Sequence, residues 1–133
     1  MLKEPPQWER HVVYWERVLA DSSQRAYAIV SAGVHVGNCG VKHISAAGEG
    51  ELWIYIGERQ QRGAGLGATA FAELLRLATE ELGLRRVYVH ARQDDPRPRR
   101  FYRRFGFEDA PLTSPEWIAR GIAVCCLERW LQS

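Results

Sequence analysis

Three glycines within five positions are the clearest chemical feature of this chain. They lie in the stretch Arg62-Gly63-Ala64-Gly65-Leu66-Gly67-Ala68, between an alternating strand pattern and an apolar-periodic helix pattern. Glycine leaves backbone N–H groups uncovered by side chains, and the helix that follows directs its positive end toward the same place. A loop of this kind typically binds a phosphate or pyrophosphate group.

Three interpretations of this loop can be compared from its residues alone, and one of them fails. Gly63 to Ala68 fits the dinucleotide pattern G-x-G-x-x-A, but Gly57 to Arg62 separate it from the strand, and Arg85 and Arg86 stand where an acidic residue is needed. A Walker-type loop fails because no Lys-Ser or Lys-Thr follows the glycines. A plain turn between strand and helix is the default for a lone glycine cluster.

A run of arginines follows the loop. Two interpretations compete: a solvated helix face, or a basic rim for an anionic ligand such as a phosphorylated cofactor. The arginines concerned are Arg85, Arg86, Arg92, Arg97, Arg99, Arg100, Arg103 and Arg104.

The apolar periodicity predicts an α/β domain. A helix is expected over residues 6–20, where Trp8, Val12, Trp15, Val18 and Leu19 recur at helical spacing. Strands are expected over residues 26–31, 35–44, 51–56, 87–90 and 122–127. Two more helices are expected, one from the glycine loop to Leu82 and a short one over residues 99–105. The length of 133 residues fits a single domain, residues 1–133.

Composition sets further bounds. The net charge of +2 is too small to indicate nucleic-acid binding, and no apolar run approaches the ~18 residues of a membrane span. The three cysteines, Cys39, Cys125 and Cys126, show no CxxC spacing, so we expect neither a disulfide framework nor a metal site. We expect a reduced, cytoplasmic protein.

A second motif narrows the interpretation of the glycine loop. The stretch Phe101-Tyr102-Arg103-Arg104-Phe105-Gly106-Phe107 follows a predicted strand and short helix. The chain here resembles the GCN5-related N-acetyltransferase (GNAT) superfamily over residues 26–108. The family's first signature, Arg/Gln-x-x-Gly-x-Gly/Ala, is matched by Arg62, Gly65 and Gly67. Its second, a Tyr four residues before Gly-Phe, is matched by Tyr102, Gly106 and Phe107.

The resemblance implies an acetyl-CoA-dependent N-acetyltransferase with a mixed, mostly antiparallel sheet flanked by helices. The cofactor pyrophosphate would lie on the backbone of Arg62, Gly63, Ala64, Gly65, Leu66, Gly67 and Ala68, and the pantetheine arm along Ile54, Tyr55 and Ile56. Asp95 stands where the family often has an Asn that contacts this arm. The family's usual first strand is expected to be missing, and because an unpaired edge invites pairing, a homodimer is expected.

The resemblance also suggests catalytic roles. Tyr102 matches the residue that often donates a proton to the departing thiolate, and Glu51 matches a general base on the preceding strand. His43 and His90 are alternative bases, and a water relay would need none of them directly.

The acceptor is open. Trp8-Glu9-Arg10-His11-Val12-Val13-Tyr14-Trp15 resembles a helix of acetyltransferases that act on nucleotide-linked amino sugars. Ribosomal-protein N-terminal acetyltransferases share much of the strand at Glu51 and the loop. A non-catalytic acyl-CoA-binding sensor or scaffold is the alternative from another class.

Overall fold

The computed structural model describes residues 13–17, 22–57, 65–121 and 123–131. The elements of this part are β1 (Val13–Arg17), β2 (Arg25–Ser31), β3 (Val34–Lys42), β4 (Glu49–Ile56), α2 (Leu66–Arg76), the π-helical turn η2 (Leu77–Glu81), β5 (Arg86–Arg92), α3 (Pro96–Arg104), β6 (Glu108–Ala110), α4 (Pro115–Arg120) and β7 (Val124–Trp130).

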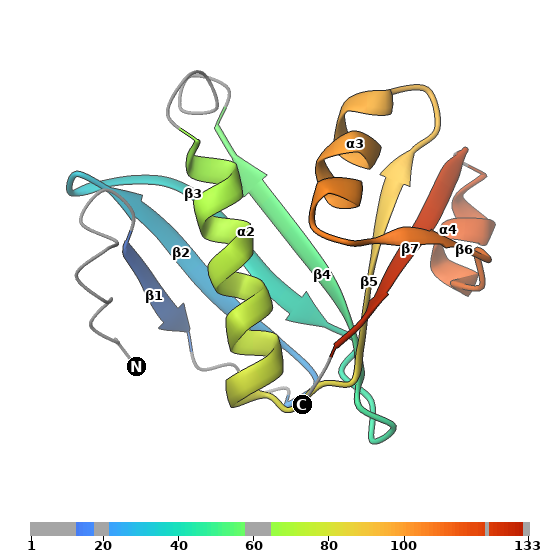
Figure 1. Cartoon of the computed structure of the whole chain (residues 1–133), viewed down its shortest axis with the longest axis horizontal. Coiled ribbons are helices and arrows are strands. Elements are labelled where there is room, and N and C mark those ends of the chain that lie inside the picture. The colour runs from blue at the N-terminus through green and yellow to red at the C-terminus, as the bar shows by residue number, and fades with distance from the viewer. Residues whose placement is uncertain (1–12, 18–21, 58–64, 122, 132–133) are drawn as a thin grey trace.

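The strands form one seven-stranded sheet in the order β1-β2-β3-β4-β5-β7-β6 (Figure 1). Every neighbouring pair is antiparallel except β4 and β5, which run parallel. A parallel pair needs a crossover connection, and α2 with η2 lies on the connection between these two strands. The expected mixed, mostly antiparallel sheet flanked by helices is confirmed.

The helix expected over residues 6–20 is wrong for residues 13–17, which form β1. β1 pairs antiparallel with β2, from Val13 opposite Val30 to Arg17 opposite Ala26. Valine, tyrosine and tryptophan favour strands, and pairing with β2 prevails over the helical spacing of the apolar residues. β1 fills the sheet position beside β2, so the expectation of a missing first strand is also wrong. Residues 1–12 lie outside the described part of the chain.

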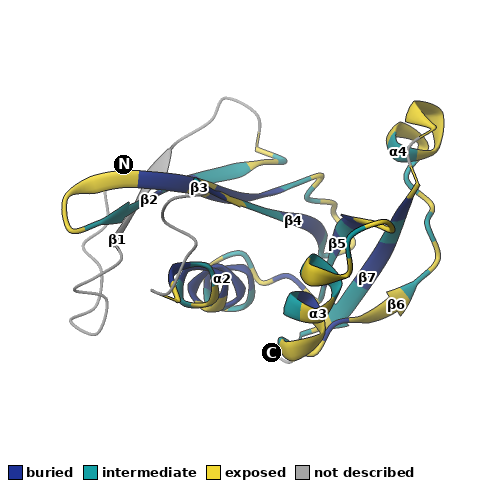
Figure 2. Cartoon of the chain, turned by 90° about the horizontal axis from the view of Figure 1, so that it is seen from above, coloured by how far each residue is buried: buried dark blue, intermediate teal, exposed yellow. Residues whose placement is uncertain are grey.

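The core lies between the sheet and the two helices α2 and α3, which cover the same face (Figure 2). Phe71 of α2 is fully buried, and its ring centroid lies 5.0–5.8 Å from those of Phe101, Tyr102, Phe105 and Phe107. Tilted and edge-on ring pairs of this kind stabilise beyond the area they bury. This aromatic cluster fixes α3, and with it Tyr102, against α2.

The strands β4 and β5 pair only at their beginnings and then diverge (Figure 1). The paired residues are Glu49 with Arg86, Gly50 with Val87, and Glu51 with Tyr88. Beyond Glu51, the strand pairing recorded for Leu52–Tyr55 in the described structure is with β3 alone. The edge of β4 that faces β5 is therefore available to an extended ligand.

The other predicted elements are confirmed with shifted bounds. The strands predicted over 26–31, 35–44, 51–56 and 87–90 are β2 to β5, and the last predicted strand is β7, which begins at Val124. The two later predicted helices are α2 with η2, and α3. β6 and α4 were not predicted. None of the helices in the described residues is long and apolar enough to cross a membrane.

Candidate active site

The beginning of α2 has the features of an anion-binding helix end. Gly65 adopts a left-handed conformation (φ 65°) at the N-cap, where the described residues supply no side-chain cap and no acidic side chain in the first turn. The first-turn N–H groups and the positive end of the helix dipole are thus available to a ligand. Arg62, Gly63 and Ala64 lie outside the described residues.

A cavity of about 610 Å³, which we call the donor cavity, lies between the end of β4, the beginning of α2, and α3. Among the described residues, a Cβ atom at Gly67 would meet side-chain carbons of Ile56 and Phe101, at 3.7 and 3.9 Å, so a glycine here leaves this part of the cavity wider. The donor cavity brings together Ile54, Ile56, Gly65, Gly67, Ala68, Asp95 and Tyr102 from the predicted site, and Arg97, Pro98, Phe101 and Arg104 complete its lining.

Of the described residues of the predicted cofactor site, two do not line this cavity. Leu66 is buried in the core. The Tyr55 side chain is 66% exposed and, by the alternation of a strand, lies on the face of β4 opposite Ile54 and Ile56. A cofactor contact from Tyr55 would therefore involve its backbone.

Tyr102 is held in the aromatic cluster on the wall of the donor cavity. Its ring centroid lies 5.4 Å from that of Phe71 and 5.9 Å from that of Phe107. Burial raises the pKa of the Tyr102 phenol above its ordinary value of 10, and the negative charge of Glu51 raises this pKa further. The phenol is therefore protonated at neutral pH and can donate a proton or a hydrogen bond.

Asp95 begins α3. Its Oδ1 accepts a hydrogen bond from the backbone N–H of Arg97 at 3.0 Å, and its two oxygens accept from the Arg97 guanidinium at 3.0 and 2.9 Å. These bonds, the side-chain bond foremost, lower the pKa of Asp95 to about 2. An aspartate at the position of the family's Asn thus serves as the N-cap of α3 while it lines the donor cavity.

Glu51 and the two candidate histidines come together on the other face of the sheet. Glu51 is 4% exposed, and its Oε2 lies 2.8 Å from Nδ1 of His90, whose side chain is 3% exposed. Nε2 of His43 lies 3.9 Å from Oε1 of Glu51. A buried carboxylate bonded to an imidazole can hold or pass on a proton, so all three candidate bases belong to one cluster.

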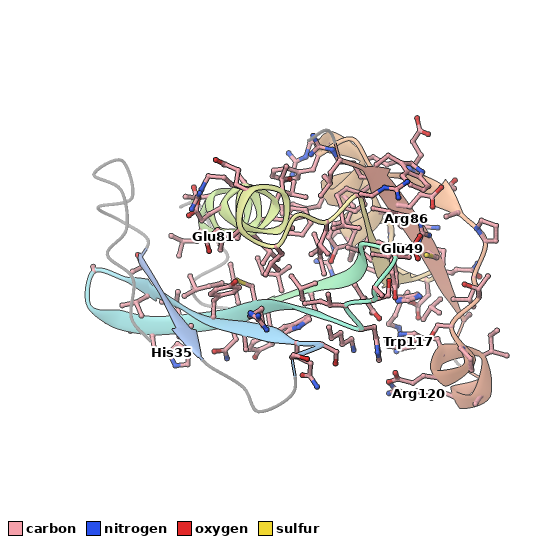
Figure 3. The ribbon with its side chains drawn as sticks, turned by 90° about the horizontal axis from the view of Figure 1, so that it is seen from below. His35, Glu49, Glu81, Arg86, Trp117 and Arg120 are labelled. Atoms are coloured by element: carbon pink, nitrogen blue, oxygen red, sulfur yellow. The ribbon has the colours of Figure 1, made fainter. Side chains whose placement is uncertain are left out.

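A second cavity, of about 300 Å³, lies between this cluster and the segment that leads into α4. We call it the α4 cavity. Figure 2 shows α4 on the side of the sheet away from α2 and α3, and Figure 3 shows Glu49, Arg86 and Trp117 around this region. Its lining is His43, Glu49, Arg86, Tyr88, His90, Thr113, Ser114, Pro115, Glu116 and Cys126.

Among the residues that line the α4 cavity, the sequence suggests a catalytic role for the two histidines, and it places Arg86 in the arginine run. The pair Ser114-Pro115 is a helix-start signal, since Ser suits an N-cap and Pro the first helical position, but no motif distinguishes it. No sequence motif links the other lining residues, Glu49, Arg86, Tyr88 and Glu116. They come together only in the folded chain, where β4 pairs with β5.

The arginine run has members in both of the expected surroundings, a rim of the donor cavity and a solvated surface. Arg97 and Arg104 line the donor cavity, as a basic rim would. Several members instead pair with carboxylates: Arg86 with Glu128 at 2.6 Å, and Arg92 with Asp94, Arg97 with Asp95 and Arg103 with Asp109, each at 2.9 Å. The last three pairs are largely exposed and contribute little to stability, whereas Arg86 and Glu128 are mostly buried.

Solved structures share the fold. The Campylobacter jejuni N-acetyltransferase PseH aligns with a TM-score of 0.67 at 13% identity, covering 84% of this chain and 71% of that chain. The dodecameric spermidine N-acetyltransferase of Vibrio cholerae aligns with a TM-score of 0.71 at 20% identity, covering 83% of this chain and 66% of that chain. The chain thus spans about two thirds of the length of the Vibrio enzyme. No curated protein sequence matches the chain.

The family is decided by sequence as well as by fold. The model of the acetyltransferase (GNAT) domain matches residues 2–108, which include the glycine loop, β4 and the Tyr102-to-Phe107 motif. This match covers most of the chain, and the parallel pair β4 and β5 diverges beside the matched loop. The chain therefore belongs to the GNAT acetyltransferase family and is an acyltransferase.

Proposed function

We propose that this protein transfers the acetyl group of acetyl-CoA to a primary amine. The observation that carries the proposal is the divergence of β4 and β5 beyond Glu51, together with two cavities on opposite faces of the sheet. The donor cavity has a helix N-terminus and arginines at its wall, and the α4 cavity has buried acid–base groups.

The donor cavity has the chemistry of a CoA site. The backbone at Gly65–Ala68, with the residues 62–64 that precede it, would bind the pyrophosphate, and Arg97 and Arg104 would add positive charge. The apolar Ile54 and Ile56 with the open edge of β4 suit an extended pantetheine arm. Bound there, acetyl-CoA supplies an activated acetyl thioester.

Acetyl transfer to an amine needs two proton movements. The ammonium must lose a proton before its nitrogen can attack, and the departing thiolate must gain one. Glu51, held by His90, accepts the first proton directly or through water, and Tyr102 donates the second. Their roles fit their positions, because Tyr102 lines the donor cavity and Glu51 lies on the face of the α4 cavity.

The acceptor has three candidate classes. The sequence suggests two of them: a nucleotide-linked amino sugar, through a helix motif of which residues 13–17 form β1 instead, and the N-terminus of a ribosomal-type protein substrate. The similar Vibrio structure is a spermidine N-acetyltransferase, which adds small polyamines to the candidates. A cytoplasmic location and a homodimer are also part of the proposal. Free Cys39, Cys125 and Cys126 support the former, and the outer edges of β1 and β6 could serve the latter.

Release of CoA thiol, followed with a thiol-reactive dye, tests the proposed function. The purified protein is incubated with acetyl-CoA and a panel of amines, and acetyl-CoA binding is measured separately by calorimetry. We expect thiol release that depends on both the protein and an amine. Tight acetyl-CoA binding without release for any amine would contradict the proposal and support the acyl-CoA sensor.

A further inference from the structure

We infer that the α4 cavity is the acceptor site and that it selects a compact, positively charged amine without a phosphate group. This inference rests on the proposed function, and it names the substrate class of that reaction. It assigns a binding role to α4, which lies beyond the residues 2–108 that match the family model.

The α4 cavity adjoins the acid–base cluster. His43 and His90 line it, and both lie beside Glu51, with His90 Nδ1 at 2.8 Å and His43 Nε2 at 3.9 Å from its carboxylate oxygens. Glu51 is also the last residue of β4 that pairs with β5 before the strands diverge. An amine in this cavity therefore approaches the point where the strands open toward the donor cavity.

Charge in the α4 cavity favours a cation. Glu49 and Glu116 line it, and the single guanidinium among its described lining residues, that of Arg86, is already engaged. Arg86 Nε donates to Glu128 at 2.6 Å, and Arg86 Nη1 lies 3.7 Å from Glu49. Its guanidinium also lies 4.9 Å from the centre of the Tyr88 ring. A phosphate would have to compete with these carboxylates for Arg86, whereas an ammonium adds charge of the favourable sign.

Glu116 is the carboxylate best placed to hold the acceptor. Its side chain is 50% exposed, and its described ion-pair partner is the half-exposed His43, 3.7 Å away. The neighbouring Trp117 packs on the buried His90, with ring centroids 5.6 Å apart, and this contact fixes α4 over the acid–base cluster. Glu116 can therefore orient a second polar or charged group of the acceptor while the reacting nitrogen lies near Glu51.

The dimensions of the α4 cavity limit the acceptor further. A volume of about 300 Å³ lies at the lower end of the range of ligand pockets, roughly 300–1,000 Å³. Thr113 and Ser114 add hydroxyl groups, which suit an acceptor with hydroxyl or amino substituents. Short diamines and amino alcohols meet these conditions, whereas the diphosphate of a nucleotide-linked sugar carries the wrong charge for this lining.

Steady-state kinetics with matched acceptors tests this inference. The probes are ethanolamine and 1,3-diaminopropane, compared with O-phosphoethanolamine, which differs from ethanolamine by its phosphate. The variants are Glu116→Gln, Glu116→Lys, and the control Glu80→Gln, an exposed carboxylate of η2 that pairs with Arg76. We expect turnover of the two cationic amines. Glu116→Gln should raise their KM about threefold to fivefold, the effect of one partly exposed ion pair.

The same experiment separates the inference from the proposed function. Glu116→Lys should shift the preference toward O-phosphoethanolamine, while Glu80→Gln should change nothing and the KM for acetyl-CoA should stay constant in all variants. Preference of the unmodified protein for the phosphorylated amine, an unchanged KM in Glu116→Gln, or turnover only of larger acceptors would overturn the inference and leave the proposed function intact. Absence of thiol release with every amine would contradict the proposed function itself.

Discussion

Two ionisable side chains lie on opposite faces of the sheet. Tyr102 lines the donor cavity from α3, and Glu51, with His90 as its partner, is the last residue of β4 that pairs with β5. The two groups interact electrostatically, since the charge of Glu51 contributes to the raised pKa of Tyr102. A carboxylate that accepts a proton and a phenol that donates one are the two functions that amine acetylation requires.

Replacement of Tyr102 tests its role as the acid. Tyr102→Phe keeps the ring that packs on Phe71 and removes the hydroxyl, so we expect kcat to fall by about 10²-fold or more while the Kd for acetyl-CoA is unchanged. Because burial raises the pKa of Tyr102 above its ordinary value of 10, the loss of wild-type activity that follows its ionisation should have its midpoint above pH 10 and be absent in the variant. An unchanged kcat would remove Tyr102 as the acid.

Substitutions of Glu51 and of its exposed neighbour His43 identify which of the two is the general base. Glu51→Gln preserves the size of the side chain and an acceptor for His90, but it cannot take up a proton. We expect it to lower kcat/KM by about 10²-fold. His43→Gln, at a side chain that is 53% exposed, should have a much smaller effect. The reverse order in these rates would make His43 the base, and thermal unfolding of each variant controls for damage to the fold.

Some of the elements that surround these residues can be predicted from the sequence, and others cannot. The glycine loop and the Tyr102 motif are each a continuous stretch of sequence. Their residue patterns therefore predict α2, α3 and most of the residues that line the donor cavity. The apolar residues around β1 also fit a helical period of 3.6, so the sequence predicts a helix there. Pairing with β2 in the folded chain makes residues 13–17 a strand instead. The α4 cavity could not be predicted, because it joins β4, β5, β7 and α4 from four separate parts of the chain.

The beginning of α2 offers a separate test of the donor cavity. Gly67 is the second residue of α2, and its conformation needs no glycine, since its φ is not positive. Alanine is the better helix former by about 1 kcal/mol, so Gly67→Ala should keep or raise the melting temperature. The added methyl enters the donor cavity, and we expect acetyl-CoA binding to weaken about tenfold, or ~1.4 kcal/mol. Unchanged affinity in calorimetry would place the pyrophosphate elsewhere.

For the whole molecule, buried thiols link stability to alkaline pH. Burial, and then the charge of Glu73, raises the pKa of Cys39 from 9.0 to about 12. Below pH 9 the thiol is protonated in both the folded and the unfolded chain. Between pH 9 and about 12 it ionises only in the unfolded chain, so the free energy of unfolding falls by up to ~1.4 kcal/mol per pH unit.

Urea unfolding at pH 8 and pH 10 measures this loss of stability. Cys39→Ala should unfold more easily at both pH values and show a smaller decrease between them. Part of the decrease should persist, because the pKa of Cys126 is also raised, to about 11. An identical decrease in the variant and the wild type would show that Cys39 is not responsible.

A crystal structure of the protein with CoA tests the central claim, that the donor cavity is the acetyl-CoA site. We predict that the pyrophosphate lies against the backbone of residues 62–68, that the pantetheine arm follows Ile54–Ile56 between β4 and β5, and that the sulfur ends beside Tyr102. Binding of CoA on another surface of the molecule, or a pantetheine arm directed away from Tyr102, would contradict the account.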